Sequence, residues 1–490
     1  MDFFDPQKQK LHNLRLNIGY VVIAVLLMLA TTILLHITYG YGINREGEVI
    51  QNGLVFVSTR PDNADVYLNG KKYKDQTNTR INAPAGQYVF ELKREGYHDW
   101  RRALTVEGGK LQRFDYPILF PKVLETAVTK QYEAAPSLST QSLDRRWLLV
   151  SKAEQNVFDR HDLDDPEAEP TLVTVPAEIL AAGSTTTGWR TVEWAKDSRH
   201  VLLQRTYDRQ GQAGSEYILF DHEDATQSRN LTVALGFNPT TIELRDQAYD
   251  RYFLYDQSSG QLFTASLSEP TPQPYVGGVL AFTAEKDVVT YVTAEDADEG
   301  KVVIRIKNGD DPSLAVRQMP AGASYLIDMA AYDNTSYLVV GVASENRAFL
   351  FRDPLGSLHK APNDPLVPVQ ILKVASPGHV SFSTNKRFVI AENGDKFAAY
   401  DIETDRGYVY QAAVAPDSPQ SHATWMDGFR LTYVSGGKLV VFDYDGTNMQ
   451  TLSAANPNYL PAFDNDYRYL YTIDAQNALT STPLLTPEDL

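Results

Sequence analysis

Residues 194–223, WAKDSRHVLLQRTYDRQGQAGSEYILFDHE, run through a polar turn, an apolar run, a polar loop and a second apolar run that ends in Phe-Asp. The same order returns in residues 382–411 and in residues 427–453, and the last of these adds a further run. Short apolar runs bounded by turn residues predict β-strands. A plan that returns about every 40–50 residues indicates an array of small sheets.

Weaker copies of this plan begin with a polar turn that leads into an aliphatic run. They start at residues 143–150, 250–256, 286–293, 334–342 and 465–473. One such unit cannot bury both faces of its sheet alone, so the array is expected to close into a ring. We therefore predict a mainly β chain with a β-propeller over residues 122–490, of eight blades, with seven as the alternative. Residues 120–136 are predicted to supply a strand that closes the ring against the C-terminal blade.

Two phrases in this region resemble known propeller blades. WAKDSRHVLL (194–203) and VFDYDGTNMQTLS (441–453) are similar to TolB-type and other Trp-Asp-repeat-like blades. Trp-Ser-Pro-Asp-Gly-Lys and Asp-x-Asp-Gly-x-Asn are typical there, and Ser-Pro and Gly are replaced in the first phrase. The resemblance implies an architecture and no particular activity.

Residues 53–121 have a different pattern. Two β-rich runs, GLVFVSTRP (53–61) and ADVYLNGKKY (64–73), come first, and Asn69-Gly70 in the second is a strong hairpin signal because both residues tolerate positive φ. A turn at residues 84–86 leads into a strand with Tyr88, Phe90 and Leu92 on one face. With two more strands around residues 108–109, about six strands predict a small sandwich or barrel.

This order of features resembles the PEGA domain family. The tetrapeptide Pro-Glu-Gly-Ala that names the family reads Pro61-Asp62-Asn63-Ala64 here, and Asn can turn where Gly turned. The resemblance implies an extracytoplasmic bacterial or archaeal protein, often with a membrane anchor close by, and implies no activity. It gives structural roles to Pro61, Ala64, Gly70, Pro84, Gly86, Gly96 and Tyr97. Tyr97 and Trp100 could form an aromatic sugar platform, but we expect them to fill the core of the small domain.

The N-terminal region predicts a membrane anchor. No Asp, Glu, Lys or Arg occurs between Arg15 and Arg45, and residues 18–35 are almost wholly apolar. At ~1.5 Å per residue such a helix spans a ~30 Å hydrocarbon core. We predict a single transmembrane anchor over residues 16–41, with its apolar surface at Ile18, Val21, Val25, Leu29, Ile33 and Leu35.

The flanking charges predict the orientation of this anchor. Lys8, Lys10 and Arg15 precede it, so residues 1–15 are expected to form a short cytoplasmic tail. The linker at residues 42–52 and the domains at 53–121 and 122–490 are then extracytoplasmic. A cleaved signal peptide is the alternative, but its apolar core is usually ~7–15 residues long, and no clear Ala-x-Ala site follows here.

Composition excludes several kinds of chemistry. The chain has no cysteine, which excludes disulfides, thiolate metal sites and cysteine nucleophiles. His-Glu-x-x-His, Gly-x-Ser-x-Gly and phosphate-binding Gly-rich motifs are absent. Of the net charge of −17, residues 53–122 carry +4, residues 1–52 carry zero, and residues 123–490 carry −21. So acidic a large domain argues against a nucleic-acid partner.

Two groups of side chains are candidate metal ligands. Acidic stretches at residues 159–169, 295–300, 308–312 and 443–448 lack the spacing of an EF-hand and are expected to be solvated loops or turns. Single histidines are predicted in or near loops and strand ends, where a propeller could gather them at one end of its channel. These are His161, His200, His222, His359, His379 and His422.

We therefore predict no catalytic, cofactor-binding or metal-binding residues. The leading hypothesis is a membrane-anchored bacterial envelope protein whose propeller binds a protein or a cell-wall glycan. Two alternatives remain: a propeller enzyme acting on envelope polysaccharide or peptide, and an accessory subunit of an envelope assembly or sensing complex.

Overall fold

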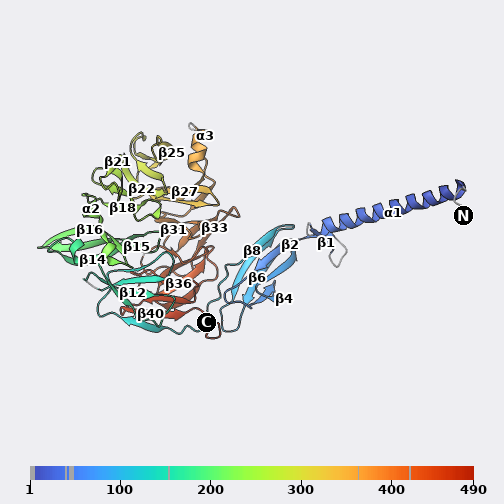
Figure 1. Ribbon diagram of the computed structural model, residues 1–490, viewed down its shortest axis with the longest axis horizontal. Helices are drawn as coiled ribbons and strands as arrows, with labels where there is room; N and C mark the ends of the chain where they lie inside the picture. The colour runs from blue at the N-terminus through green and yellow to red at the C-terminus, as the bar shows by residue number, and fades with distance from the viewer. Residues whose placement is uncertain are drawn as a thin grey trace. The chain divides into compact units, whose positions relative to one another are not determined.

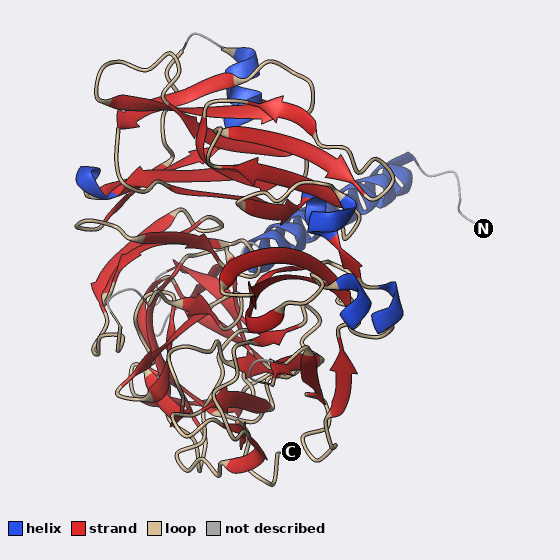
Figure 2. Ribbon diagram, turned by 90° about the vertical axis from the view of Figure 1, so that its left-hand side faces the viewer, coloured by secondary structure: helices blue, strands red, loops and turns tan. Residues whose placement is uncertain are grey.

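The protein is described by a computed structural model over residues 6–38, 41–43, 49–152, 155–361, 364–418 and 421–489. Half of the chain is β-strand and 11% is helix, so the prediction of a mainly β protein is confirmed (Figures 1 and 2). Internal contacts divide the chain into two compact units. The first comprises residues up to Lys122 together with Asp489, and the second comprises residues Val123–Glu488.

The N-terminal helix α1 (Pro6–Thr38) is long and apolar (Figure 1). Its span His12–His36 has the length and composition to cross a membrane, and none of it is buried in the protein. The predicted anchor residues Ile18, Val21, Val25, Leu29, Ile33 and Leu35 are all exposed. The hydroxyls of Thr31 and Thr32 donate to the carbonyls of Leu27 and Met28, both at 2.8 Å, so both hydroxyls are satisfied within the helix.

The helix ends at Thr38, three residues before the predicted end of the anchor. Tyr41–Ile43 forms β1, which pairs antiparallel with β2 from Val49 onward. The predicted linker at residues 42–52 is therefore partly strand, because β2 begins earlier than its apolar pattern indicates. Residues 44–48 of that linker lie outside the described residues.

Residues 41–43 and 49–114 form two four-stranded sheets. One has the order β1-β2-β5 with β8 parallel to β2, and the other has the order β4-β3-β6-β7. The strands are β2 (Val49–Val57), β3 (Asp65–Leu68), β4 (Lys71–Gln76), β5 (Thr79–Pro84), β6 (Gly86–Lys93), β7 (Trp100–Val106) and β8 (Leu111–Phe114). Buried apolar side chains from both sheets make the core, among them Val55, Val66, Ile81, Phe90 and Leu92. β5 was not predicted, because Thr-Arg-Ile-Asn-Ala-Pro has a weak strand pattern.

The predicted hairpin at Asn69-Gly70 is confirmed. Both residues have positive φ, +49° and +76°, and they join β3 to β4. The Asn69 side chain fixes the turn further, because its Oδ1 accepts a hydrogen bond of 2.8 Å from the Val89 amide. Asn63 also has a positive φ of +61°, so it turns where the family tetrapeptide has Gly.

Within its described residues, the second unit contains eight four-stranded antiparallel sheets, which we number in chain order. Sheet 1 is β10 (Ser139–Gln141), β11 (Trp147–Ser151), β12 (Val157–Asp162) and β13 (Thr171–Thr174). Sheet 2 is β14 (Thr185–Trp194), β15 (His200–Arg209), β16 (Gln212–Asp221) and β17 (Arg229–Asn230). Sheet 3 is β18 (Thr241–Leu244), β19 (Arg251–Asp256), β20 (Gln261–Ser266) and β21 (Gln273–Val276). Sheet 4 is β22 (Val279–Glu285), β23 (Val288–Thr293), β24 (Lys301–Asn308) and β25 (Leu314–Pro320).

The remaining four sheets follow the same plan. Sheet 5 is β26 (Leu326–Tyr332), β27 (Thr335–Val342), β28 (Arg347–Arg352) and β29 (Gln370–Lys373). Sheet 6 is β30 (His379–Phe382), β31 (Phe388–Asn393), β32 (Lys396–Asp401) and β33 (Arg406–Gln411). Sheet 7 is β34 (Thr424–Trp425), β35 (Arg430–Ser435), β36 (Lys438–Asp443) and β37 (Gln450–Ala454). Sheet 8 is β38 (Ala462–Phe463), β39 (Tyr469–Ile473), β40 (Ala478–Pro483) and β9 (Ala127–Gln131).

Short helical turns lie between some of these strands. They are η1 (Ala177–Ile179), η2 (Ala225–Gln227), α2 (Leu231–Ala234), η3 (Arg245–Gln247), η4 (Ala343–Glu345) and α3 (Pro354–Lys360). The eight sequence starts all mark the same place in the fold, because each one leads into the second strand of a sheet: β11, β15, β19, β23, β27, β31, β35 and β39. These second strands are buried on both faces, which is why they are the most apolar and the easiest to recognise.

The order of packing among the sheets is circular. Apolar clusters join sheets 1 to 2, 2 to 3, 3 to 4, 4 to 5, 5 to 6 and 6 to 7. The Thr472 hydroxyl of sheet 8 donates to the Ala454 carbonyl of sheet 7 at 2.7 Å. Leu148 and Val150 of sheet 1 then pack with Tyr471 and Ile473 of sheet 8. The predicted strand within residues 120–136 is β9, which pairs antiparallel with β40 and completes sheet 8.

Candidate functional site

Acidic side chains gather on the first strands of four successive sheets. First strands of neighbouring sheets lie beside one another, as β14 does with β18, and β26 with both β22 and β30. Glu193, Glu243, Glu285 and Asp328 come from the first strands of sheets 2, 3, 4 and 5. The charges of Glu193 and Asp328 both act on Glu243, and that of Glu285 acts on Asp328. These partly buried carboxylates, which we call the first-strand acids, therefore lie close enough for their charges to act on one another.

Two of these carboxylates tie one sheet to the next. Glu193 Oε2 accepts a hydrogen bond of 2.8 Å from the Leu244 amide of sheet 3. Asp328 Oδ2 accepts one of 3.2 Å from the Phe382 amide of sheet 6. Burial raises the pKa of Glu193 to about 7 and the pKa of Asp328 to about 6, although these hydrogen bonds act in the opposite direction. Both groups thus have an evident structural use.

Glu243 is placed differently. Burial, together with the neighbouring charges of Glu193 and Asp328, raises its pKa to about 8. A carboxyl group in these surroundings favours its protonated form near neutral pH, which reduces its repulsion with the other first-strand acids.

Two of the histidines do come together. His379 at the start of β30 and His422, which precedes β34, stack with ring centroids 4.0 Å apart. His379 pairs across strands with Glu392 of β31, and both oxygens of Glu392 accept from the Ala423 amide at 3.0 and 3.1 Å. Burial lowers the pKa of His379 to about 4. The spacing along the chain gave no sign of this contact, because sheets 6 and 7 must first pack together.

The other four histidines do not join this pair. His161 lies in β12 and contacts the Tyr132 hydroxyl at 3.1 Å, and His222 contacts the Ser198 carbonyl at 3.0 Å. His200 stacks on Tyr249, and His359 lies in α3, a helix that the sequence did not predict. Within the described ranges, no group of three or more His, Asp or Glu side chains is placed to hold a metal ion.

The acidic stretches are only partly solvated. Asp159 is 1% exposed in β12, so the expectation of a solvated loop is wrong for this residue, which lies within a strand rather than after it. Asp443 is also buried, and its Oδ2 accepts from the Asn448 side chain at 2.8 Å. In residues 295–300, Asp296 and Asp298 pair with Arg305 and Lys301 at 2.6 and 2.8 Å.

The buried carboxyl of Glu392 gives a testable pH dependence. Burial raises its pKa from 4.5 in the unfolded chain to about 8, so the folded state favours the protonated form. Its contribution is complete below about pH 4.5 and is lost as the pH rises through 8. Glu392→Gln cannot ionise, and its amide oxygen can still accept from Ala423. From pH 7 to pH 9 the variant should gain roughly 1.4 kcal/mol of unfolding free energy relative to the unmodified protein.

Urea unfolding at pH 5, 7 and 9 measures this difference. Glu299→Gln, at an exposed position, is the matched control and should stay parallel to the unmodified protein. A difference between Glu392→Gln and the unmodified protein that remains constant over this range would contradict the raised pKa.

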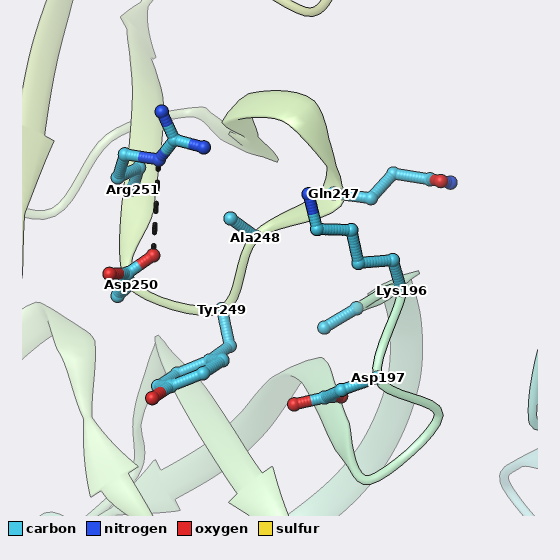
Figure 3. Close-up of a pocket in the computed structure, with 8 residues that line it drawn as sticks. Lys196, Asp197, Gln247, Ala248, Tyr249, Asp250 and Arg251 are labelled. Atoms are coloured by element: carbon cyan, nitrogen blue, oxygen red, sulfur yellow. Dashed lines mark ion pairs between the residues drawn. The ribbon is translucent and has the colours of Figure 1, made fainter.

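A pocket lies between the turns that join the first and second strands of sheets 2 and 3 (Figure 3). Its volume is about 360 Å³, in the range of small-ligand sites. We call it the Tyr249 pocket; its lining is Ala195, Lys196, Asp197, Gln247, Ala248, Tyr249, Asp250 and Arg251. The Gln247 side chain also hydrogen-bonds Glu193, so this pocket adjoins one of the first-strand acids.

Charges in the Tyr249 pocket are balanced by their neighbours. Lys196 Nζ lies 2.8 Å from Asp246 Oδ2, and an Arg251 nitrogen lies 3.5 Å from the same oxygen. A second Arg251 nitrogen lies 3.9 Å from Asp250, the ion pair drawn in Figure 3. The pocket thus presents donors and acceptors of both signs without a strong net charge.

The two sheets formed by residues 41–43 and 49–114 match a known domain family. Residues 52–119 match the PEGA domain. This match covers the two sheets β2-β5-β8 and β4-β3-β6-β7 almost entirely.

The predicted motif residues of the PEGA domain occupy turns and the core. Ala64 and Tyr97 are buried, and the Arg60–Pro61 peptide bond is cis. Gly70 and Gly96 have φ of +76° and +81°, which few other residues adopt. Pro84 ends β5, and Gly86 begins β6. Trp100 is 3% exposed and Tyr97 1%, so neither presents a ring face to solvent for a sugar.

Comparisons of the whole chain are less informative. No curated protein matches it. Among solved structures, the computationally designed protein Ika8 is 10% identical, covers 73% of this chain and 98% of its own, and has a TM-score of 0.43. Hsv2 from Kluyveromyces lactis is 9% identical over 65% of this chain and 98% of its own, with a TM-score of 0.40. Both scores are below 0.5 and support no conclusion about fold or function.

Proposed function

We propose that this protein is a single-pass membrane protein of the bacterial envelope whose eight-sheet domain is an eight-bladed β-propeller. In this proposal the propeller binds a partner protein or a cell-wall glycan outside the membrane and performs no catalysis. The circular packing of eight four-stranded sheets, completed by β9 on β40, supports the propeller.

The observation that carries the proposal is the pairing of α1 with the PEGA domain at the N-terminal end. An exposed apolar helix directly before an extracytoplasmic type of domain fits a membrane-anchored envelope protein. The proposed layout is a cytoplasmic tail at residues 1–15, an anchor at 16–41, a PEGA domain at 53–121 and a propeller at 122–490. The basic residues before the span support this orientation.

Binding rather than catalysis is proposed because three of the four acids whose pKa burial raises to between about 6 and 8 have structural partners. Glu193, Asp328 and Glu392 each accept a hydrogen bond from the backbone of the next sheet. Catalytic acids and bases need access to a substrate, whereas these side chains hold neighbouring sheets together. The Tyr249 pocket, in contrast, is open and lined by polar groups that suit recognition.

Removing residues 6–41 should release the protein from membranes. The full chain is expected in the membrane fraction and should resist washing at alkaline pH. The reason is that its apolar span is not buried in the protein and has the length to be buried in a membrane. The shortened protein, exported by an unrelated cleavable signal peptide, should be recovered in the soluble envelope fraction. Equal membrane retention of both proteins would contradict anchoring by α1, and a shorter mature N-terminus of the full chain would indicate cleavage.

Binding is tested by co-sedimentation of the full chain, in detergent, with isolated cell-wall sacculi and by crosslinking in intact cells. Saturable sedimentation that is lost when residues 123–490 are removed would support a wall-glycan ligand. A specific crosslinked protein without sedimentation would support a protein partner. Absence of both would contradict the binding role.

A further inference from the structure

We propose that the Tyr249 pocket is a sugar-binding site that takes an uncharged pyranose unit of a glycan chain. This inference rests on the proposed function and deepens it, because it chooses the glycan over the protein ligand and assigns the residues that bind it.

The aromatic ring of Tyr249 is the first observation. Tyr249 is 40% exposed, and in the described part of residues 123–489 it is the one Phe, Trp or Tyr side chain that is strongly exposed. An aromatic residue is costly to leave in water, and every other aromatic side chain described in this domain is at least partly buried. The exposed ring also lies in a pocket rather than on a convex surface (Figure 3).

The ring is held in one orientation. His200 stacks against it with centroids 4.2 Å apart and an angle of 13° between the planes. His200 Nδ1 in turn lies 2.7 Å from Asp197 Oδ2, which fixes the imidazole. One face of Tyr249 is therefore covered, and the exposed area falls on the opposite face and the edge. A rigid flat ring of this kind suits the apolar C–H face of a pyranose.

The polar groups around the ring match hydroxyls. Asp250 and Asp197 supply carboxylate acceptors, and Lys196 and Arg251 supply donors; side chains of Lys196, Asp250 and Arg251 are 57%, 52% and 41% exposed. A hydroxyl both donates and accepts, so it can bridge such groups, whereas an ion would meet the wrong sign on one side. Because Asp246 and Asp250 offset the two cations, the pocket gives no net attraction to anions.

The backbone of the pocket is preorganised as well. Asp246 and Gln247 have consecutive positive φ values, +55° and +49°, a strained combination for side chains without glycine's freedom. The Lys196 amide donates to the Gln247 carbonyl at 2.8 Å, which holds the two turns together. The wall of the pocket is thus fixed before a ligand arrives, which lowers the entropic cost of binding.

The test is calorimetric titration of the full chain in lauryldimethylamine oxide, a detergent without a sugar headgroup. The probes are cellotetraose, chitotetraose and tetragalacturonate. We expect one of the two neutral tetrasaccharides to bind with a Kd on the order of 0.1–1 mM, changed less than about twofold between 50 and 500 mM NaCl. Tighter binding of tetragalacturonate, or no binding of either neutral probe at 10 mM, would overturn the proposal.

Variants locate the site. Tyr249→Ala should weaken binding at least tenfold, while Tyr249→Phe, which keeps the ring, should stay within about twofold. Asp250→Ala should weaken binding about threefold to tenfold through loss of an acceptor. Leu460→Ala is the matched control. It also removes an exposed apolar side chain, but Leu460 does not line the pocket, so this variant should bind normally. Normal binding by Tyr249→Ala would overturn the assignment.

The two proposals fail separately. If the unmodified chain and Tyr249→Ala sediment equally with sacculi, the pocket assignment is wrong while the binding role stands. If neither protein sediments and no partner crosslinks, the proposed binding role is wrong. Calorimetric titration then still tests whether the Tyr249 pocket binds a neutral sugar.

Discussion

Replacing Arg205 by methionine is expected to cost roughly 3–5 kcal/mol of unfolding free energy, because it leaves a buried carboxylate without its cation. Arg205 of β15 is 1% exposed and Glu216 of β16 is 3% exposed, and they face each other across the two strands. The Arg205 Nη1 and Glu216 Oε1 atoms are 2.6 Å apart. Urea unfolding monitored by tryptophan fluorescence measures the loss.

The surroundings explain why the cost is high. Arg205 also donates to Thr186 and Ser184 at 2.6 and 3.0 Å, and Glu216 Oε2 accepts from Asn230 at 2.6 Å. Every member of this network is satisfied by another, so removal of one leaves several polar groups unpaired.

A double variant separates charge from packing. Arg205→Met with Glu216→Leu removes both ions and should recover at least half of the loss, since a well-packed apolar pair often replaces a buried ion pair without cost. Arg305→Met is the control, because Arg305 pairs at 2.6 Å with Asp296, whose side chain is 79% exposed. It should cost less than about 1 kcal/mol. A single Arg205→Met loss no larger than this control would show that the buried pair contributes little.

The sequence predicted the repeating part of the fold well. All eight apolar starts, including the five weaker ones, mark second strands, because a strand buried on both faces must be apolar along its whole length. First strands are harder to find. β34 and β38 have two residues each, and the carboxylates on β14, β18 and β26 interrupt the apolar pattern.

The candidate sites were largely beyond prediction. The contacts of Tyr249 with His200, and of His379 with His422, join residues of neighbouring sheets, so their spacing along the chain carries no signal. Tyr97 and Trp100 are aromatic residues that could form a sugar platform, but they are buried in the small domain, as expected. One signal for the pocket was present: Tyr249 stands in a polar turn, Gln-Ala-Tyr-Asp-Arg, where no strand needs an aromatic residue.

Replacing β9 by five Gly and Ser residues is expected to destabilise the whole eight-sheet domain. β9 is the one strand of sheet 8 that comes from the start of this unit, and it pairs with β40 from the end of the chain. The bonds around it include the Gln131 side chain to the Gln476 carbonyl at 2.9 Å and the Tyr132 amide to the Asn477 carbonyl at 3.1 Å. Loss of these bonds would separate the start of this unit from its last sheet, sheet 8.

We expect a loss of at least ~4 kcal/mol, from several hydrogen bonds and from the buried side chain of Tyr132, which packs between sheets 8 and 1. Calorimetric unfolding should change from one transition in this domain to a broad one at lower temperature, because sheets at the open ends can then separate independently.

The matched control replaces β13, an equally exposed outer strand that pairs only within sheet 1. Because β13 does not join the first sheet to the last, its replacement should lower the unfolding free energy by less and leave a single transition. Equal losses from the two replacements would mean that joining the first sheet to the last adds no stability beyond that of an ordinary outer strand.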